Sequence, residues 1–222
     1  MSNLTSKAFG GLLFLFVAFA AMLFIPAWTF SYWQAWTFLV VFFVSASAIS
    51  AYLMKNDPKL LERRASGSEQ ETSQKIIQFL LTIAFLASVI IPSLDHRFAW
   101  SVVPPYVVII GDALVALALL VIFLVFKENT FTSRVVEVDA EQRVISTGPY
   151  ALVRHPMYMG ALFLFIGIPL ALGSWWGLLT FIPLTLIIIW RLLDEERFLA
   201  TNLPGYVEYR NNVRYRLVPF IW

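Results

Sequence analysis

Residues 157–190 read MYMGALFLFIGIPLALGSWWGLLTFIPLTLIIIW, and this run contains no charged side chain. A single helix of this length, at about 1.5 Å per residue, would be far longer than the ~30 Å hydrocarbon core of a membrane. The sequence Gly-Ser-Trp-Trp-Gly at positions 173–177 is typical of a turn with an aromatic pair at the membrane surface. We therefore predict two short membrane helices, the second of which continues through Arg191 to about Leu199.

The composition of the whole chain is that of an integral membrane protein. Of its 222 residues, 59% are hydrophobic and only 14% are charged, whereas soluble domains are about half apolar and about a quarter charged. Membrane helices need ~20 apolar residues each, and four further candidate runs occupy residues 8–27, 33–54, 76–91 and 102–126. The sequence thus predicts an all-α, polytopic membrane bundle of about six transmembrane helices.

The first apolar run has a second interpretation as a signal peptide. Lys7 would be its positively charged start, and Ala18-Phe19-Ala20 would be the cleavage site. The apolar run continues well past that site, which favours a retained helix.

Several classes of protein are excluded or disfavoured by what the chain lacks. There is no cysteine, and the only two histidines are far apart, so we expect no zinc site and no other metal. The net charge of +2 is too small to indicate nucleic-acid binding. Glu137, Asp139 and Glu141 resemble a metal-binding cluster, but residues 134–146 alternate like a small hairpin, and alternation alone would put the three acids on its solvent-exposed face.

The distribution of Lys and Arg predicts the orientation in the membrane. These residues gather in the loop 55–75, in the segment 127–155 and in the tail after Trp190, whereas the other connections hold only Arg97. We expect both termini and the polar segments around residue 155 to be cytosolic. The membrane would be a plasma membrane or an endoplasmic reticulum, depending on the organism.

The polar motif that precedes the uncharged run, TGPYALVRHPMYMG at 147–160, contains the first candidate site residues. Pro156 suits the first turn of a helix, which places Arg154 and His155 beside free backbone N–H groups and a positive dipole end. Such a position suits an anionic group. An anchor at the membrane surface would explain Arg154 alone, but explains the neighbouring Tyr150 and Tyr158 less well.

A second candidate cluster ends the sixth predicted helix. Arg191 and Glu195 share a helix face, and Glu196 follows directly. A surface ion pair is the simpler interpretation, but charged residues beside apolar ones at a membrane edge are functional-site candidates. The tail after residue 203 mixes Arg with aromatic residues, which indicates an interfacial segment; such a segment could also fold back over the site.

Together these motifs resemble the isoprenylcysteine carboxyl methyltransferase family, which is grouped with the phospholipid methyltransferases among integral membrane enzymes that use S-adenosyl-L-methionine. The resemblance covers roughly residues 129–222. It rests on Gly148-Pro149-Tyr150, Arg154-His155-Pro156-Met157-Tyr158-Met159-Gly160, Arg191…Glu195-Glu196…Leu199 and Tyr206…Tyr209…Pro219.

The resemblance implies an S-adenosyl-L-methionine pocket at the cytosolic edge of a catalytic region at 129–222, with the four spans of 1–128 preceding it. The residues that would bind the cofactor are Gln142, Arg143, Val144, Ile145, Tyr150, His155, Pro156, Met157, Tyr158 and Glu195. Arg191 would hold the substrate, and Glu195 or Glu196 could act as a base for an amine acceptor.

The acceptor implied by the resemblance is a lipophilic molecule from the bilayer, with a carboxylate such as prenylcysteine as the leading candidate. A carboxylate needs no general base, only an orienting cation such as Arg191. A phospholipid amine is the alternative acceptor. Membrane sterol reductases, which use NADPH and have a similar Arg-His-Pro-x-Tyr region, are the alternative enzyme class, although they are generally longer. No nucleotide-binding glycine motif is present.

Overall fold

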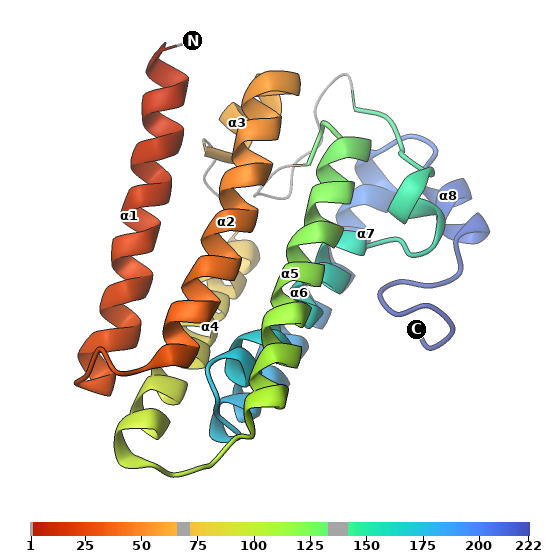
Figure 1. Ribbon diagram of the computed structural model, residues 1–222. Helices are drawn as coiled ribbons and strands as arrows, with labels where there is room; N and C mark the ends of the chain where they lie inside the picture. Colours follow the sequence, from red (N-terminus) through yellow and green to blue (C-terminus); the bar gives the residue numbers. More distant parts are fainter. Residues whose placement is uncertain (1, 66–71, 133–141) are drawn as a thin grey trace.

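Long apolar helices make up the computed structural model (Figure 1), which describes residues 2–65, 72–132 and 142–222. Five segments are long and apolar enough to cross a membrane: α1 (Ser2–Ala27), α2 (Trp33–Asn56), α4 (Thr72–Phe98), α5 (Pro105–Glu128), and Trp176–Asn202, which joins the 3-10 turn η2 (Trp176–Thr180) to α7 (Phe181–Asn202). The shorter apolar helix α6 (Pro156–Ala171) is the sixth member of the bundle. The predicted all-α membrane bundle is confirmed.

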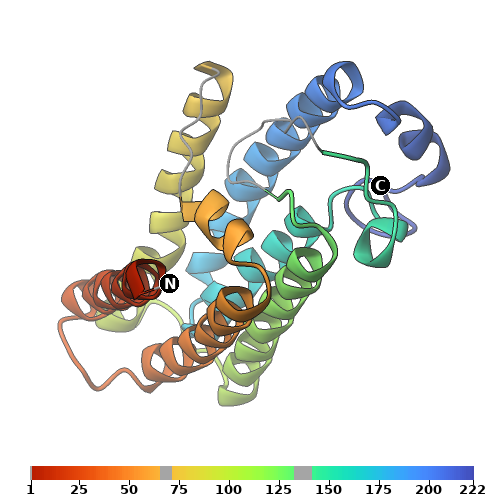
Figure 2. The same ribbon diagram turned by 90° about the horizontal axis from the view of Figure 1, so that it is seen from above.

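Three short helices lie at one end of this bundle. They are α3 (Pro58–Ala65), the 3-10 turn η1 (Gly148–Ala151) and α8 (Tyr206–Asn212). Seen from above, α1, α2 and α5 lie along one side, α7 lies on the other side, and α6 lies between α5 and α7 (Figure 2). The bundle therefore has one end with additional helices and one end with only short connections.

The uncharged run at 157–190 forms two helices, as its length predicts. α6 ends at Ala171, and Gly173 takes a φ of 71°, a left-handed conformation that glycine adopts without steric cost. The chain then reverses direction through η2 into α7. This turn keeps both helices short enough to bring the start of α6 and the end of α7 to the same end of the bundle.

The third predicted helix is longer than expected, because α4 continues through Pro92 to Phe98. Proline removes one backbone hydrogen bond, but membrane helices tolerate it where side chains satisfy the freed groups. Because Pro92 has no N–H, the carbonyl of Ser88 loses its helical donor, while the next carbonyl, that of Val89, accepts a hydrogen bond from the hydroxyl of Ser93 at 3.0 Å. The expected end of this helix at residue 91 is therefore wrong.

The end of the bundle with short connections is fixed by the buried carboxylate of Asp95. Asp95 accepts hydrogen bonds from the backbone N–H of Ser101 at 2.8 Å and from the hydroxyl groups of Ser101 and Ser174, both at 2.5 Å. Exposed tryptophans, which favour membrane–water interfaces, gather in the same connections and adjoining turns: Trp28, Trp33, Trp36, Trp100, Trp175 and Trp176.

The first helix is part of the core, since Phe19 and Leu23 are buried in a hydrophobic cluster shared with α2 and α4. Residues 133–141, which include most of the predicted hairpin with Glu137, Asp139 and Glu141, lie outside the described residues. Within the described ranges, no group of three or more histidine or acidic side chains is placed to hold a metal ion.

The closest helix contact joins α5 to α6 through glycine. A Cβ atom added to Gly111 would lie 2.1 Å from the backbone nitrogen of Ala171, and one added to Gly167 would lie 3.0 Å from the backbone nitrogen of Val115. Because these neighbours are backbone atoms, they cannot rotate away. Small residues at such contacts let membrane helices pack backbone to backbone.

We predict that Gly111→Ala destabilises the bundle by about 1–3 kcal/mol, the usual cost of forcing extra atoms into a packed core. Gly10→Ala is the matched control, because a Cβ atom there meets nothing within 4 Å. Thermal unfolding of the detergent-purified variants measures the effect. Equal unfolding midpoints for the two variants would contradict the close contact.

Candidate active site

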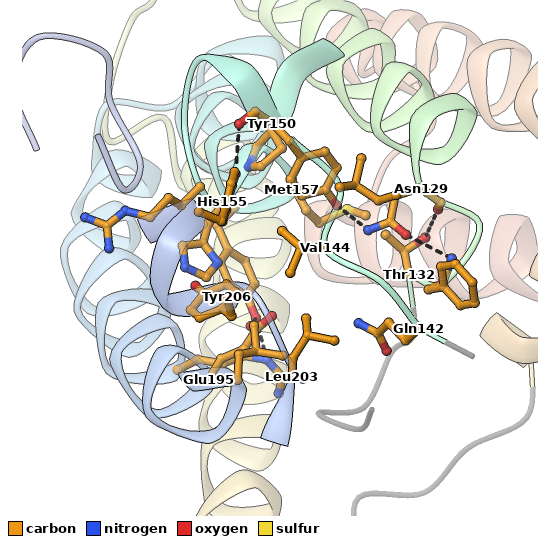
Figure 3. Close-up of a pocket in the computed structure, with 18 of the residues that line it drawn as sticks. Asn129, Thr132, Gln142, Val144, Tyr150, His155, Met157, Glu195, Leu203 and Tyr206 are labelled. Atoms are coloured by element: carbon orange, nitrogen blue, oxygen red, sulfur yellow. Dashed lines mark hydrogen bonds between the residues drawn. The ribbon is translucent and has the colours of Figure 1, made fainter. Parts of the chain in front are cut away.

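A cavity of about 290 Å³ lies at the end of the bundle that carries the short helices α3, η1 and α8, each of which contributes to its lining. Its walls come from α4, α6 and α7, from the segment 142–145 and from α8 (Figure 3). Small-molecule sites usually have volumes of about 300–1,000 Å³, so the volume of this cavity lies just below that range. It is large enough for a cofactor of modest size.

The structure brings the predicted cofactor-binding residues together around this cavity. The lining includes Gln142, Arg143, Val144, Ile145, Tyr150, His155, Pro156, Met157, Tyr158 and Glu195, and also Arg191. In Figure 3, His155, Tyr206 and Glu195 lie on one side, Asn129, Thr132 and Gln142 lie on the other, and Val144 lies between them. Of the predicted catalytic residues, Arg191 and Glu195 line the cavity and Glu196 does not.

The start of α6 is built as the sequence predicts, with Pro156 as the first helical residue. His155 precedes it with a non-helical backbone (φ −125°, ψ 65°). The backbone N–H groups of Arg154 and His155 donate to the carbonyls of Tyr215 and Arg216, each at 2.9 Å. The C-terminal tail therefore holds this part of the motif in place. The side chains of Arg154 and His155 are both buried.

A line of three polar side chains crosses one wall of the cavity. Arg191 Nε donates to the hydroxyl oxygen of Tyr158 at 3.0 Å, and this hydroxyl donates to Glu195 Oε2 at 2.5 Å. Hydrogen bonds with a charged partner are short and strong. The phenol thus joins the guanidinium to the carboxylate and fixes the orientation of both.

Three tyrosines with protonated hydroxyls, Tyr150, Tyr206 and Tyr209, also line the cavity. Asn129 Nδ2 donates to the hydroxyl of Tyr150 at 3.0 Å, and Tyr209 donates its hydroxyl to the carbonyl of Tyr150 at 2.8 Å. Burial raises the pKa of Tyr150 to about 12, and burial also raises the pKa of Tyr206 and Tyr209 above the ordinary value. The buried hydroxyl of Tyr206 has no hydrogen-bond partner among the described residues, so it is available to a ligand.

Glu196 lies behind the cavity, where it accepts hydrogen bonds from two arginines and lies near the ring of His155. Its Oε1 atom is 2.6 Å from Arg154 Nη1 and 3.4 Å from His155 Nε2, and its Oε2 atom is 3.0 Å from Arg216 Nε. Glu196 is only 4% exposed. Successive helical residues point about 100° apart, so Glu195 faces the cavity while Glu196 faces the tail.

Several cavity residues were not predicted from the sequence. Arg64 comes from α3, Gln78 and Leu81 come from α4, and Asn129 follows α5. They lie far from the motif in the chain, and no local pattern marks them. The tail contributes Tyr206 and Tyr209 to the lining, so this part of it folds back over the cavity.

The structure thus has the helices of a polytopic membrane protein and, at one end of its bundle, a cavity lined by both polar and apolar side chains. Residues 106–204 match the family model described as phospholipid methyltransferase. This match confirms the resemblance to integral membrane methyltransferases, and its range contains Arg191, Glu195 and all the predicted cofactor-binding residues. A comparison with curated proteins found no match.

We predict that Glu196→Gln destabilises the protein by about 3–5 kcal/mol, because breaking a buried ion pair leaves uncompensated charge on its partners. Glu208→Gln is the control, since Glu208 is an exposed carboxylate on α8 and its loss should change the free energy of unfolding by less than about 0.5 kcal/mol. Thermal unfolding in detergent compares the two. Similar midpoints would show that the Glu196 cluster contributes nothing to stability.

Proposed function

We propose that the protein transfers a methyl group from S-adenosyl-L-methionine to a lipophilic acceptor, with a carboxylate such as prenylcysteine as the leading candidate. The observation that carries the proposal is the Arg191–Tyr158–Glu195 line within a cavity at the end of a membrane bundle. It lies inside the segment that matches a methyltransferase family. At the end of a membrane bundle, a water-soluble cofactor and an acceptor dissolved in the bilayer can both reach the same cavity.

The chemistry of the lining fits the cofactor. S-adenosyl-L-methionine supplies an electrophilic methyl group on a sulfonium centre. The Glu195 carboxylate suits its ammonium or ribose groups, and the free hydroxyl of Tyr206 is a further donor. The rings of His155 and Tyr158 stack with centroids 5.7 Å apart, and a phenol face can stabilise a nearby cation. The wall formed by Gln142, Arg143, Val144 and Ile145 would complete the pocket.

The residues of the chain would act mainly by orientation. Tyr158 holds Arg191 and Glu195 in fixed positions, so that a guanidinium and a carboxylate serve opposite ends of the reacting pair. Arg191 would bind the acceptor carboxylate, and positioning two reactants supplies much of the acceleration of a direct displacement. The tail residues Leu203 and Tyr206 would exclude water from an anion that attacks a cation.

The acceptor would enter from the bilayer, with its apolar part against Leu81 and Ile188 of the cavity wall. The positive charge at the cavity end, which includes Arg64, Arg143 and Lys127, supports a cytosolic orientation of the site and of both termini. We propose residues 129–222 as the catalytic region and 1–128 as the membrane part that supports it. Arg64 and Gln78 belong to the membrane part and would also line the catalytic cavity.

The second candidate acceptor is a phospholipid amine, which the description of the matching family favours. An amine must lose a proton when it is methylated, and Glu195 is the carboxylate placed in the cavity to accept it. The products of the two reactions differ chemically. A methyl ester is cleaved by mild base, whereas a methylamine is stable, so base treatment of the methylated product distinguishes the acceptors.

We predict that the detergent-purified protein binds S-adenosylhomocysteine saturably in calorimetric titration. Glu195→Gln should weaken binding by about 10- to 100-fold, as expected for loss of a hydrogen bond to a charged group worth ~1.5–3 kcal/mol. Glu208→Gln, a carboxylate exposed on α8, should bind like the unmodified protein. NADPH titrated in parallel should not bind; binding of NADPH without S-adenosylhomocysteine would place the protein with the membrane reductases instead.

A further inference from the structure

The last nine residues, Arg214 to Trp222, form a strap across the start of α6. The strap accepts hydrogen bonds at the carbonyls of Tyr215 and Arg216 from the backbone N–H groups of Arg154 and His155. The strap is itself folded back, because the N–H groups of Arg216, Leu217 and Val218 donate to the carbonyl of Trp222 at 3.0, 2.9 and 3.1 Å. Two successive residues of the motif are thus fixed by a segment some sixty residues further along the chain.

Arg216 is the residue at which the strap meets the polar cluster. Its backbone carbonyl accepts from His155, its Nε donates to Glu196 Oε2 at 3.0 Å, and its guanidinium carbon lies 5.2 Å from the ring centre of Trp222. Arg154 makes the reciprocal pair of contacts: Nη1 donates to Glu196 Oε1 at 2.6 Å and Nη2 donates to the carbonyl of Arg214 at 3.1 Å. Each arginine therefore ties Glu196 to the junction of strap and motif.

The contact continues from this junction into the cavity. The ring of His155 stacks on the ring of Tyr158 at an interplanar angle of 22°, and the hydroxyl of Tyr158 joins Arg191 to Glu195. A displacement of His155 would change the position of Tyr158, because stacked rings in a packed interior move together. The strap lies outside the cavity lining, so Arg216 can act on the site only through these neighbours.

We infer that Arg216 is a positioning residue that sets the orientation of His155, and through it the Tyr158–Glu195 pair, by binding Glu196 from the strap side. The effect on cofactor binding rests on the proposed function, whereas the effect on His155 does not. Lysine would keep the positive charge but cannot reproduce the planar guanidinium contact with both Glu196 and Trp222.

The chain offers a direct test, because it contains only two histidines, His96 and His155. His96 stacks on Tyr32 at 4.0 Å, at the opposite end of the bundle, and serves as an internal reference. Imidazole ¹⁵N NMR spectra of the full chain in detergent, with His155→Gln for assignment, would report each ring separately. Arg216→Ala should shift the His155 signals and leave those of His96 in place. Arg210→Ala, an exposed arginine on α8, should leave both unchanged.

The second measurement is calorimetric titration with S-adenosylhomocysteine. Arg216→Ala should raise Kd about tenfold, Arg216→Lys should give a smaller increase, and Arg210→Ala should give none. If Arg216→Ala does not fold, the NMR spectra and the titration are both recorded on Arg216→Lys instead. Unchanged His155 signals in the Arg216 variants overturn the inference whether or not the cofactor binds. Shifted His155 signals in a protein that never binds S-adenosylhomocysteine uphold the positioning role and refute the proposed function.

Discussion

The buried carboxylate of Glu196 is the contact on which the arrangement of the cavity depends. It binds basic side chains from the start of α6 and from the C-terminal strap, while its own backbone belongs to α7. In a low-dielectric interior such charges are tolerated only when they are paired and hydrogen-bonded. One paired carboxylate therefore holds three separate segments together, and the neighbouring Glu195 is left to face the cavity.

The membrane sets the second constraint. Only helices satisfy their backbone groups within lipid, so the polar site must lie where the helices end. The chain turns after α6, where Gly173 has a positive φ, and α6 packs closely on α5 at Gly111. Together these features bring the start of α6 and the end of α7 to the same end of the bundle. The other end of the bundle is fixed by Asp95 and surrounded by exposed tryptophans. The two ends thus have different chemistry: anchoring at one and a polar cavity at the other.

The helices and the core of the site could be predicted from the sequence because their signals are local. Apolar runs predict the helices, and Pro156 predicts the start of α6 beside His155. The contribution of Arg64 or Gln78 could not be predicted, because only the packing of the bundle brings α3 and α4 to the cavity. The different positions of Glu195 and Glu196 also depend on helix rotation, and α4 continues past Pro92 because tertiary contacts outweigh the local signal. The roles of the cavity residues stay predictions.

We propose that a methyl group is transferred in this cavity from a water-soluble donor to a lipophilic acceptor. The most direct measurement uses the full chain in liposomes that contain a prenylated cysteine or phosphatidylethanolamine, with S-adenosyl-L-methionine labelled in its methyl group. The account predicts label in the extracted lipid phase for the unmodified protein, and its loss in Tyr158→Phe, which keeps the ring but removes the hydroxyl between Arg191 and Glu195. Equal transfer by Tyr158→Phe, or no lipid-phase label with either acceptor, would contradict it.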